Sequence, residues 1–208
     1  MEAARIVHPL EPLYTERSRV LVLGTMPSPK SREVGFYYGH PQNRFWKVLG
    51  ALFGEPEPLG IEGRTAFLHA HGIALWDVLA SCTIVGASDA SIADPVPNDL
   101  TRIAAVAPLE AVFTTGGKAT ALYQRFGASQ LPRVAHTGLP STSPANARMR
   151  LDDLVEAYRP LRDVLDAANP ALRDPRGAFP AFAATPLGDS LGGEVEKRRN
   201  DGDTPGGV

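Results

Sequence analysis

The run RVLVLGT, residues 19–25, joins β-branched and leucine side chains to a closing glycine and threonine. A short apolar run that ends in a glycine turn is typical of a strand buried inside a sheet. Three later stretches share this pattern, namely residues 72–79, 110–117 and 132–139. The sequence therefore predicts four short strands, each followed by a turn.

Helical patterns separate these strands, at residues 43–53, 64–70, 98–106 and 118–126. A last helix is predicted to open with Ser143 as its N-cap and Pro144 at its first position, where the missing N–H costs nothing. Alternating strands and helices favour a mainly parallel sheet covered on both faces, which makes the fold class α/β. In such sheets, ligands bind at the carboxyl ends of the strands.

Composition sets further limits on the protein. The net charge is −2, so binding to DNA would need a local basic patch. The sequence has one cysteine, Cys82, which excludes an intramolecular disulfide and a cysteine-cluster metal site. No run is apolar or long enough for a membrane span or a signal peptide, so we expect a cytoplasmic protein. We expect residues 1–168 to form one domain. We expect residues 169–208, which are rich in Pro, Gly and charged residues, to form a disordered tail.

Several motifs admit a purely structural interpretation. TTGGKAT, residues 114–120, is no phosphate loop because Val112 stands where a glycine is required, and Lys118 is either a phosphate contact or a solvated lysine. Asp77 and Asp89 are interpreted as structural, because their separation gives no evidence of proximity. Ser141 and Ser143 lack a nucleophile elbow, which favours capping or phosphate contact.

The stretch GFYYGHPQNRFW, residues 35–46, concentrates five aromatic rings in twelve positions. Rings in a glycine-bracketed loop suit stacking on a planar base, although a rigid turn packed under the sheet would also use them. His40 and Asn43 offer hydrogen bonds, and Arg44 and Lys47 offer positive charge for phosphates. The sequence therefore predicts a nucleobase site in this loop.

With these motifs in place, the sequence resembles the uracil-DNA glycosylase superfamily, and more narrowly its hypoxanthine-DNA (deoxyinosine) glycosylase branch. Four stretches carry the resemblance: VLVLGTMPSPKSREVGFYYGHPQNRFWKVLG, LWDVLASC, GASDASI and LPSTSPANA. The resemblance spans residues 19–165. It implies a three-layer α/β/α sandwich around a four-stranded parallel sheet. It also implies a monomeric hydrolase, free of metal and other cofactors, that flips a deaminated base out of DNA and starts base excision repair.

The resemblance also assigns residues. Asn43 takes the catalytic role, and Tyr38 stacks on the flipped base. We add His40 as a hydrogen-bond donor to the leaving base. The expected base pocket further includes Gly24, Thr25, Met26, Pro27, Ser28, Phe36 and Thr115, and the expected DNA contacts are Lys118, Ser141, Thr142 and Ser143.

Two positions depart from the superfamily pattern. Met26 stands where many members carry Asn or Asp to orient water, and Thr115 stands where related sequences often have the Asn of FNG. The preferred lesion therefore stays open among hypoxanthine, uracil, xanthine and a mismatch. Three alternatives remain: a non-catalytic binder of DNA lesions or single strands on the same fold, a broader mismatch-specific uracil-DNA glycosylase, and an unrelated nucleotide-binding α/β protein.

Overall fold

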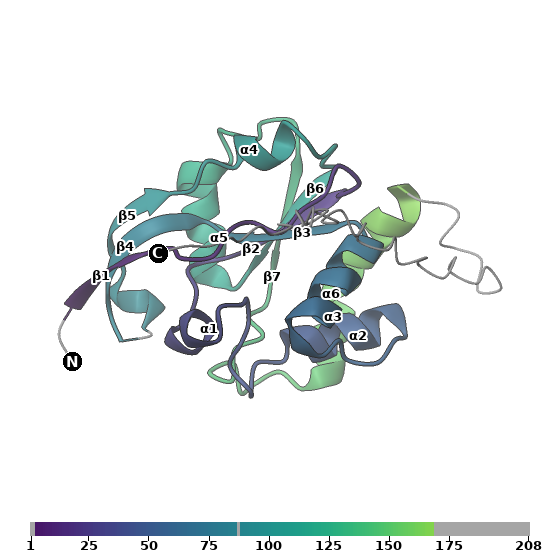
Figure 1. The fold of residues 1–208 in the computed structure, drawn as a ribbon, viewed down its shortest axis with the longest axis horizontal. Helices are drawn as coiled ribbons and strands as arrows, with labels where there is room; N and C mark the ends of the chain where they lie inside the picture. Colours follow the sequence, from purple (N-terminus) through teal and green to yellow (C-terminus); the bar gives the residue numbers. More distant parts are fainter. Residues whose placement is uncertain (1–2, 87, 169–208) are drawn as a thin grey trace, which may run out of the picture. The chain divides into compact units, whose positions relative to one another are not determined.

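A computed structural model describes residues 3–86 and 88–168 of the chain. Its centre is a four-stranded sheet in the order β3-β2-β6-β7, in which all neighbouring strands run parallel (Figure 1). The strands are β2 (Val20–Gly24), β3 (Ile73–Asp77), β6 (Ala111–Thr115) and β7 (Ala135–Leu139). The predicted α/β class and its four parallel strands are confirmed.

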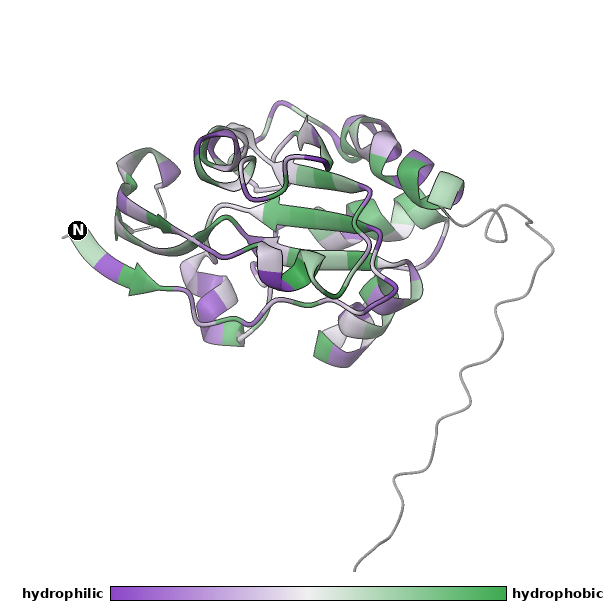
Figure 2. Cartoon of the chain, turned by 90° about the horizontal axis from the view of Figure 1, so that it is seen from above, coloured by the Kyte–Doolittle hydropathy of each residue, from purple (hydrophilic) through white to green (hydrophobic). Residues whose placement is uncertain are grey.

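The apolar runs form these strands because the sheet is covered on both faces. Every residue of β2, β3 and β6 is buried, whereas the edge strand β7 is mostly exposed. Figure 2 shows the central strands in green, with helices on both sides of them. In the parallel register Gly24 lies opposite Asp77, and Thr115 lies opposite Leu139, so the carboxyl ends of all four strands meet at one edge.

The helices follow the sequence pattern with shifted ends. α6 packs on α2 and β2, α3 packs on β3, and α5 packs on β6 and β7. Their bounds are α1 (Pro29–Val34), α2 (Phe45–Phe53), α3 (Gly60–Ala70), α4 (Thr101–Ala104), α5 (Gly117–Leu122) and α6 (Leu151–Ala168). The structure also has a short 3₁₀ helix, η1 (Asp89–Ser91), and a π-helical segment, η2 (Tyr123–Gly127). Helix α1 was not predicted, and its start has an N-cap bond from the Ser31 N–H to the Ser28 hydroxyl.

The predicted start of the last helix is wrong. Ser143 and Pro144 lie in an irregular loop, and the helix begins at Leu151. The Ser143 hydroxyl accepts a hydrogen bond from the N–H of Ala145, which makes a local turn and no cap. The N–H of Arg150 instead donates to the Asp153 carboxylate at 2.8 Å, so an acidic side chain satisfies the helix start.

A second, antiparallel sheet was missed entirely. It has the order β1-β4-β5, formed by β1 (Ala3–Val7), β4 (Leu79–Val85) and β5 (Ala93–Pro97). Most positions of β1 and β5 are exposed, and β5 contains two prolines, so neither shows the alternation that marks a strand. Only Val78 separates β3 from β4, so the chain passes directly from the central sheet into the small one.

The segment after β1 covers the outer edge of β3. Leu13 and Leu75 exchange two backbone hydrogen bonds, of 2.9 and 2.8 Å, in an isolated antiparallel bridge. The N–H of His8 donates to the Ala80 carbonyl at 2.8 Å. These bonds fix the path of residues 8–13 along the sheet.

Candidate active site

The first active-site loop begins where β2 ends. The Gly24 carbonyl accepts the N–H of Val78 at 2.9 Å, and the Thr25 carbonyl accepts the N–H of Leu79 at 3.2 Å. The loop continues through Met26, which packs against the core, and the buried Pro27 to Ser28, the cap of α1. The predicted loop thus lies at the carboxyl edge of the sheet, held by the chain that leaves β3.

The aromatic loop is mostly core. Phe36 is 5% exposed and Tyr37 3% exposed, and the Tyr37 hydroxyl donates to the Glu11 carbonyl at 3.0 Å. The Trp46 indole N–H donates to the Tyr37 carbonyl at 3.2 Å. The burial of Phe36 and Tyr37 fits the second of the two interpretations of this loop, a rigid turn packed against the core.

Tyr38 is the ring that remains at the site. Its φ is 50°, its ring lies nearly parallel to that of Phe45 with 3.8 Å between centroids, and its hydroxyl is 2.8 Å from Thr115 Oγ1. Burial, and after it the negative charge of Asp77, raises the pKa of the Tyr38 phenol, while the Thr115 hydrogen bond opposes this shift. Tyr38 is accordingly a neutral ring, fixed by its hydroxyl to the end of β6 and by stacking to α2.

Asn43 connects the aromatic loop, residues 35–46, to the second active-site loop, residues 139–146. Its side-chain Oδ1 accepts the Thr142 hydroxyl at 2.9 Å and the N–H of Phe45 at 3.0 Å. Both partners are donors, so the oxygen of the amide must face them and the Nδ2 group faces elsewhere. Thr142 is 1% exposed. The amide is thus oriented by a residue 99 positions away, and among the described residues its two N–H donors have no partner.

Arg44 lies beneath the second loop rather than toward solvent. Its guanidinium donates to the carbonyls of Ser143 at 3.1 Å, Asn146 at 2.8 Å and Met149. Its backbone N–H adds a bond to the Thr142 carbonyl at 3.1 Å. The interpretation of Arg44 as a free charge for phosphates is therefore wrong, because its donors hold the loop.

The serines of the second loop shape its turns. Ser141 Oγ accepts the N–H of Ser143 at 3.2 Å, and the Ser141 carbonyl accepts the Asn146 amide at 2.9 Å. Ser141 also packs close to Gly116, where an added Cβ would lie 3.2 Å from the Cβ of Ser141. The loop is consequently built against the end of β6.

One ring nitrogen of His40 is bonded within its own loop. Nδ1 accepts the N–H of Gln42 at 3.1 Å, so the neutral ring carries its proton on Nε2. Among the described residues Nε2 has no hydrogen-bond partner. His40 can therefore act as a donor beside Asn43.

Two carboxylates flank the first loop, although their spacing in the sequence did not indicate that they are close together. Asp77 ends β3 directly opposite Gly24, and the Asp89 carboxylate accepts the Thr25 hydroxyl at 3.3 Å. Partial burial raises the pKa of Asp89, while the Thr25 hydrogen bond and the charge of Lys118 oppose this shift. The signal for Asp77 was its place near the carboxyl end of a predicted strand, residues 72–79.

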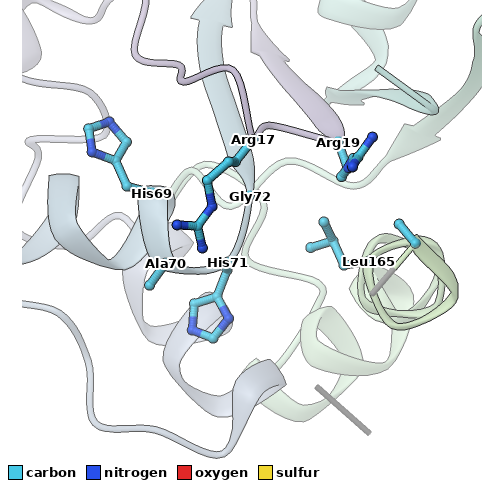
Figure 3. Close-up of a pocket in the computed structure, with 8 residues that line it drawn as sticks. Arg17, Arg19, His69, Ala70, His71, Gly72 and Leu165 are labelled. Carbon is cyan, nitrogen blue, oxygen red and sulfur yellow. The ribbon is translucent and has the colours of Figure 1, made fainter. Parts of the chain in front are cut away.

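A hollow at the opposite edge of the central sheet is separate from this site. Its lining, drawn in Figure 3, comes from the chain that enters β2 and β3 and from the end of α6, and includes Arg17, Arg19, His69 and Leu165. Within the described ranges no group of three or more His, Cys, Asp or Glu could hold a metal ion. No described helix is long and apolar enough to cross a membrane.

Comparison with known proteins identifies relatives of this architecture. A model described as Uracil DNA glycosylase superfamily matches residues 11–163. Two proteins named hypoxanthine DNA glycosylase are similar. The one from Methanosarcina barkeri is 32% identical over 114 residues (54% of this chain, 72% of that protein). The one from Methanosarcina acetivorans is 31% identical over 136 residues (64% and 84%).

A solved structure agrees with these matches. The solution NMR structure of a candidate uracil DNA glycosylase from Methanosarcina acetivorans superposes with a TM-score of 0.64 and 28% identity, covering 76% of this chain and 99% of that one. The superfamily model covers most of the domain that carries both loops of the site. The chain therefore belongs to the uracil DNA glycosylase superfamily.

Proposed function

We propose that this protein is a DNA-deoxyinosine glycosylase, which releases hypoxanthine from DNA and leaves an abasic site. The observation that carries the proposal is the Asn43–Thr142 hydrogen bond, which joins the aromatic loop to the second active-site loop. The two relatives named hypoxanthine DNA glycosylase support it. The reaction is a hydrolysis: the C1′–N9 bond breaks, water supplies oxygen to C1′, and the base leaves with the bonding electrons and gains a proton.

The base has to leave the helical stack before this bond can be reached. We assign the face of the half-buried Tyr38 ring that Phe45 does not cover to stacking on the flipped base. Residues 24–28 and Thr115 would border the base, with Phe36 supporting the loop from the core. The energy of flipping would be recovered in part by this stacking.

Negative charge develops on the departing base, so donors aimed at it lower the barrier. Asn43 Nδ2 and His40 Nε2 are such donors, because the acceptor atom of each side chain is already bonded within the loop. Activating a water molecule would instead need a free acceptor, which Asn43 does not offer in this arrangement. We therefore assign Asn43 and His40 to the leaving base.

The DNA backbone needs other contacts. Lys118 lies in the first turn of α5 and has no hydrogen-bond or ion-pair partner among the described residues, so it is available to a phosphate. Ser141 and Ser143 expose part of their surface on the second loop. We assign these three residues to phosphate contacts and the Thr142 hydroxyl to orientation of Asn43.

The test is a panel of labelled oligonucleotides, each with one hypoxanthine, uracil, xanthine or mismatched thymine, followed by alkali to cut abasic sites. We expect cleavage at hypoxanthine under single-turnover conditions, reduced by about 10²-fold or more in Asn43→Ala. Binding to a duplex with a tetrahydrofuran abasic analogue should change less than about threefold. Binding without cleavage of any substrate would contradict the proposal and favour the non-catalytic binder.

A further inference from the structure

Asp77 has a buried carboxylate at the edge of the site. The residue is 5% exposed, and its Oδ2 lies 2.8 Å from Nε2 of His8, which comes from the segment along β3. The exposed fractions of the two side chains are 3% for His8 and 7% for Asp77. A buried carboxylate needs such a partner, because burial of an unpaired charge is unfavourable.

The hydrogen bonds of His8 fix which nitrogen faces Asp77 as a donor. Nδ1 accepts the N–H of Leu10 at 3.2 Å, so the neutral ring carries its proton on Nε2 and donates it to Asp77. The ring also packs edge-on against Trp76. His8 lies outside residues 11–163, the region matched by the superfamily model, so the match gives it no role.

The second carboxylate oxygen of Asp77 faces the first loop. An added Cβ on Gly24 would stand 2.2 Å from Asp77 Oδ1 and 3.4 Å from the Tyr38 hydroxyl. Among the described residues, no donor bonds to Oδ1. A nearly buried acceptor with unused capacity therefore lies against Gly24, on the side where the Tyr38 hydroxyl also approaches.

We propose, as an extension of the proposed function, that Asp77 accepts the imino N–H of the flipped base and that His8 is the positioning residue that holds it. Deamination of adenine turns N1 from an acceptor into an N–H, and deamination of cytosine does the same at N3. A fixed carboxylate oxygen binds that N–H and repels the lone pair of the undamaged base. Guanine also has an N1–H, so its exclusion depends on other contacts.

The test compares single-turnover excision of hypoxanthine with that of 1-methylhypoxanthine, in which a methyl group replaces the imino hydrogen. We expect the wild-type protein to prefer hypoxanthine by at least about tenfold. In Asp77→Ala the hypoxanthine rate should fall about 10- to 100-fold, and the two rates should come within about threefold of each other. Asp152→Asn, an exposed acidic residue of α6, is the matched control and should behave as wild type.

His8 is tested with two substitutions. His8→Gln places an amide N–H near the position of Nε2 and should keep the preference, whereas His8→Phe should lose most of it. Binding to the abasic analogue should remain within about twofold for every variant, because that DNA has no base to contact Asp77. If Asp77→Ala does not fold by circular dichroism, the difference between His8→Gln and His8→Phe decides.

Different results overturn different claims. If the variants slow both substrates equally and keep the wild-type preference, Asp77 and His8 are merely structural, and this inference fails while the proposed function stands. If the wild-type protein excises no base, the proposed function fails first, and the role of Asp77 falls with it.

Discussion

Replacing Arg44 with methionine tests whether this side chain stabilises the second active-site loop or binds a DNA phosphate. Methionine keeps the apolar stem and removes the donors to the carbonyls of Ser143, Asn146 and Met149. A hydrogen bond from a charged donor contributes about 1.5–3 kcal/mol when buried. Arg44 is half-buried, so water replaces part of each bond, and we expect the free energy of unfolding to fall by about 3 kcal/mol in total.

Thermal and urea unfolding measure this loss. For a domain of this size, about 3 kcal/mol corresponds to a decrease of roughly 6–12 °C in Tm. Arg44→Lys is the matched control for charge, and it should lose most of the same stability because an ammonium cannot span three carbonyls. A Tm within about 2 °C of wild type in Arg44→Met would show that the loop does not depend on this side chain.

The salt dependence of DNA binding supplies the complementary control. Lys47, exposed on α2 and without a partner among the described residues, is the residue better placed for phosphate. If it contacts one, Lys47→Met should lower the slope of log K against log salt by about 0.9, with Tm unchanged. A lowered slope and normal Tm in Arg44→Met instead would refute our assignment of the guanidinium to the loop.

Three further predictions test the surroundings of the site. Thr142→Val removes the donor to Asn43 at constant shape and should slow excision about 3- to 10-fold in single-turnover assays, from a loss of about 1 kcal/mol. Gly24→Ala should abolish excision because its Cβ meets a carboxylate oxygen at 2.2 Å, whereas Gly63→Ala, with open space around it, should be neutral or raise Tm. Burial lowers the pKa of His136, so the unfolded state binds more protons than the folded state at acidic pH. The free energy of unfolding should therefore fall as the pH drops through about 6.5. In thermal melts between pH 5.5 and 7.5, His136→Gln should make the free energy of unfolding depend less on pH.

The sequence predicted the strands that are buried on both faces of the sheet, because such strands consist of continuous apolar residues. β2, β3 and β6 are buried at every position, so they read as unbroken apolar runs and their number and direction could be predicted. β1 is mostly exposed and β5 contains prolines, so their pairing with β4 depends on backbone hydrogen bonds that no side-chain pattern encodes.

The sequence led us to expect the candidate site at the carboxyl ends of the strands, but it did not indicate which side chains bond to one another there. Gly24, Tyr38 and Thr115 could be placed together because they follow from strand ends and from the resemblance. The bond between Thr142 and Asn43 joins positions 99 residues apart, and the His8–Asp77 pair joins positions 69 apart. Which donor meets which acceptor over such separations depends on tertiary packing, and a single sequence contains no local signal for it.

The bridge between Leu13 and Leu75 has a consequence for how this protein fails under stress. β3 is an edge strand, and an uncovered edge can pair with a strand of another molecule. Release of residues 8–13 by local unfolding would expose that edge and at the same moment withdraw His8 from Asp77. Aggregation during storage and loss of lesion selectivity should therefore share one initiating event, well below the temperature of global unfolding.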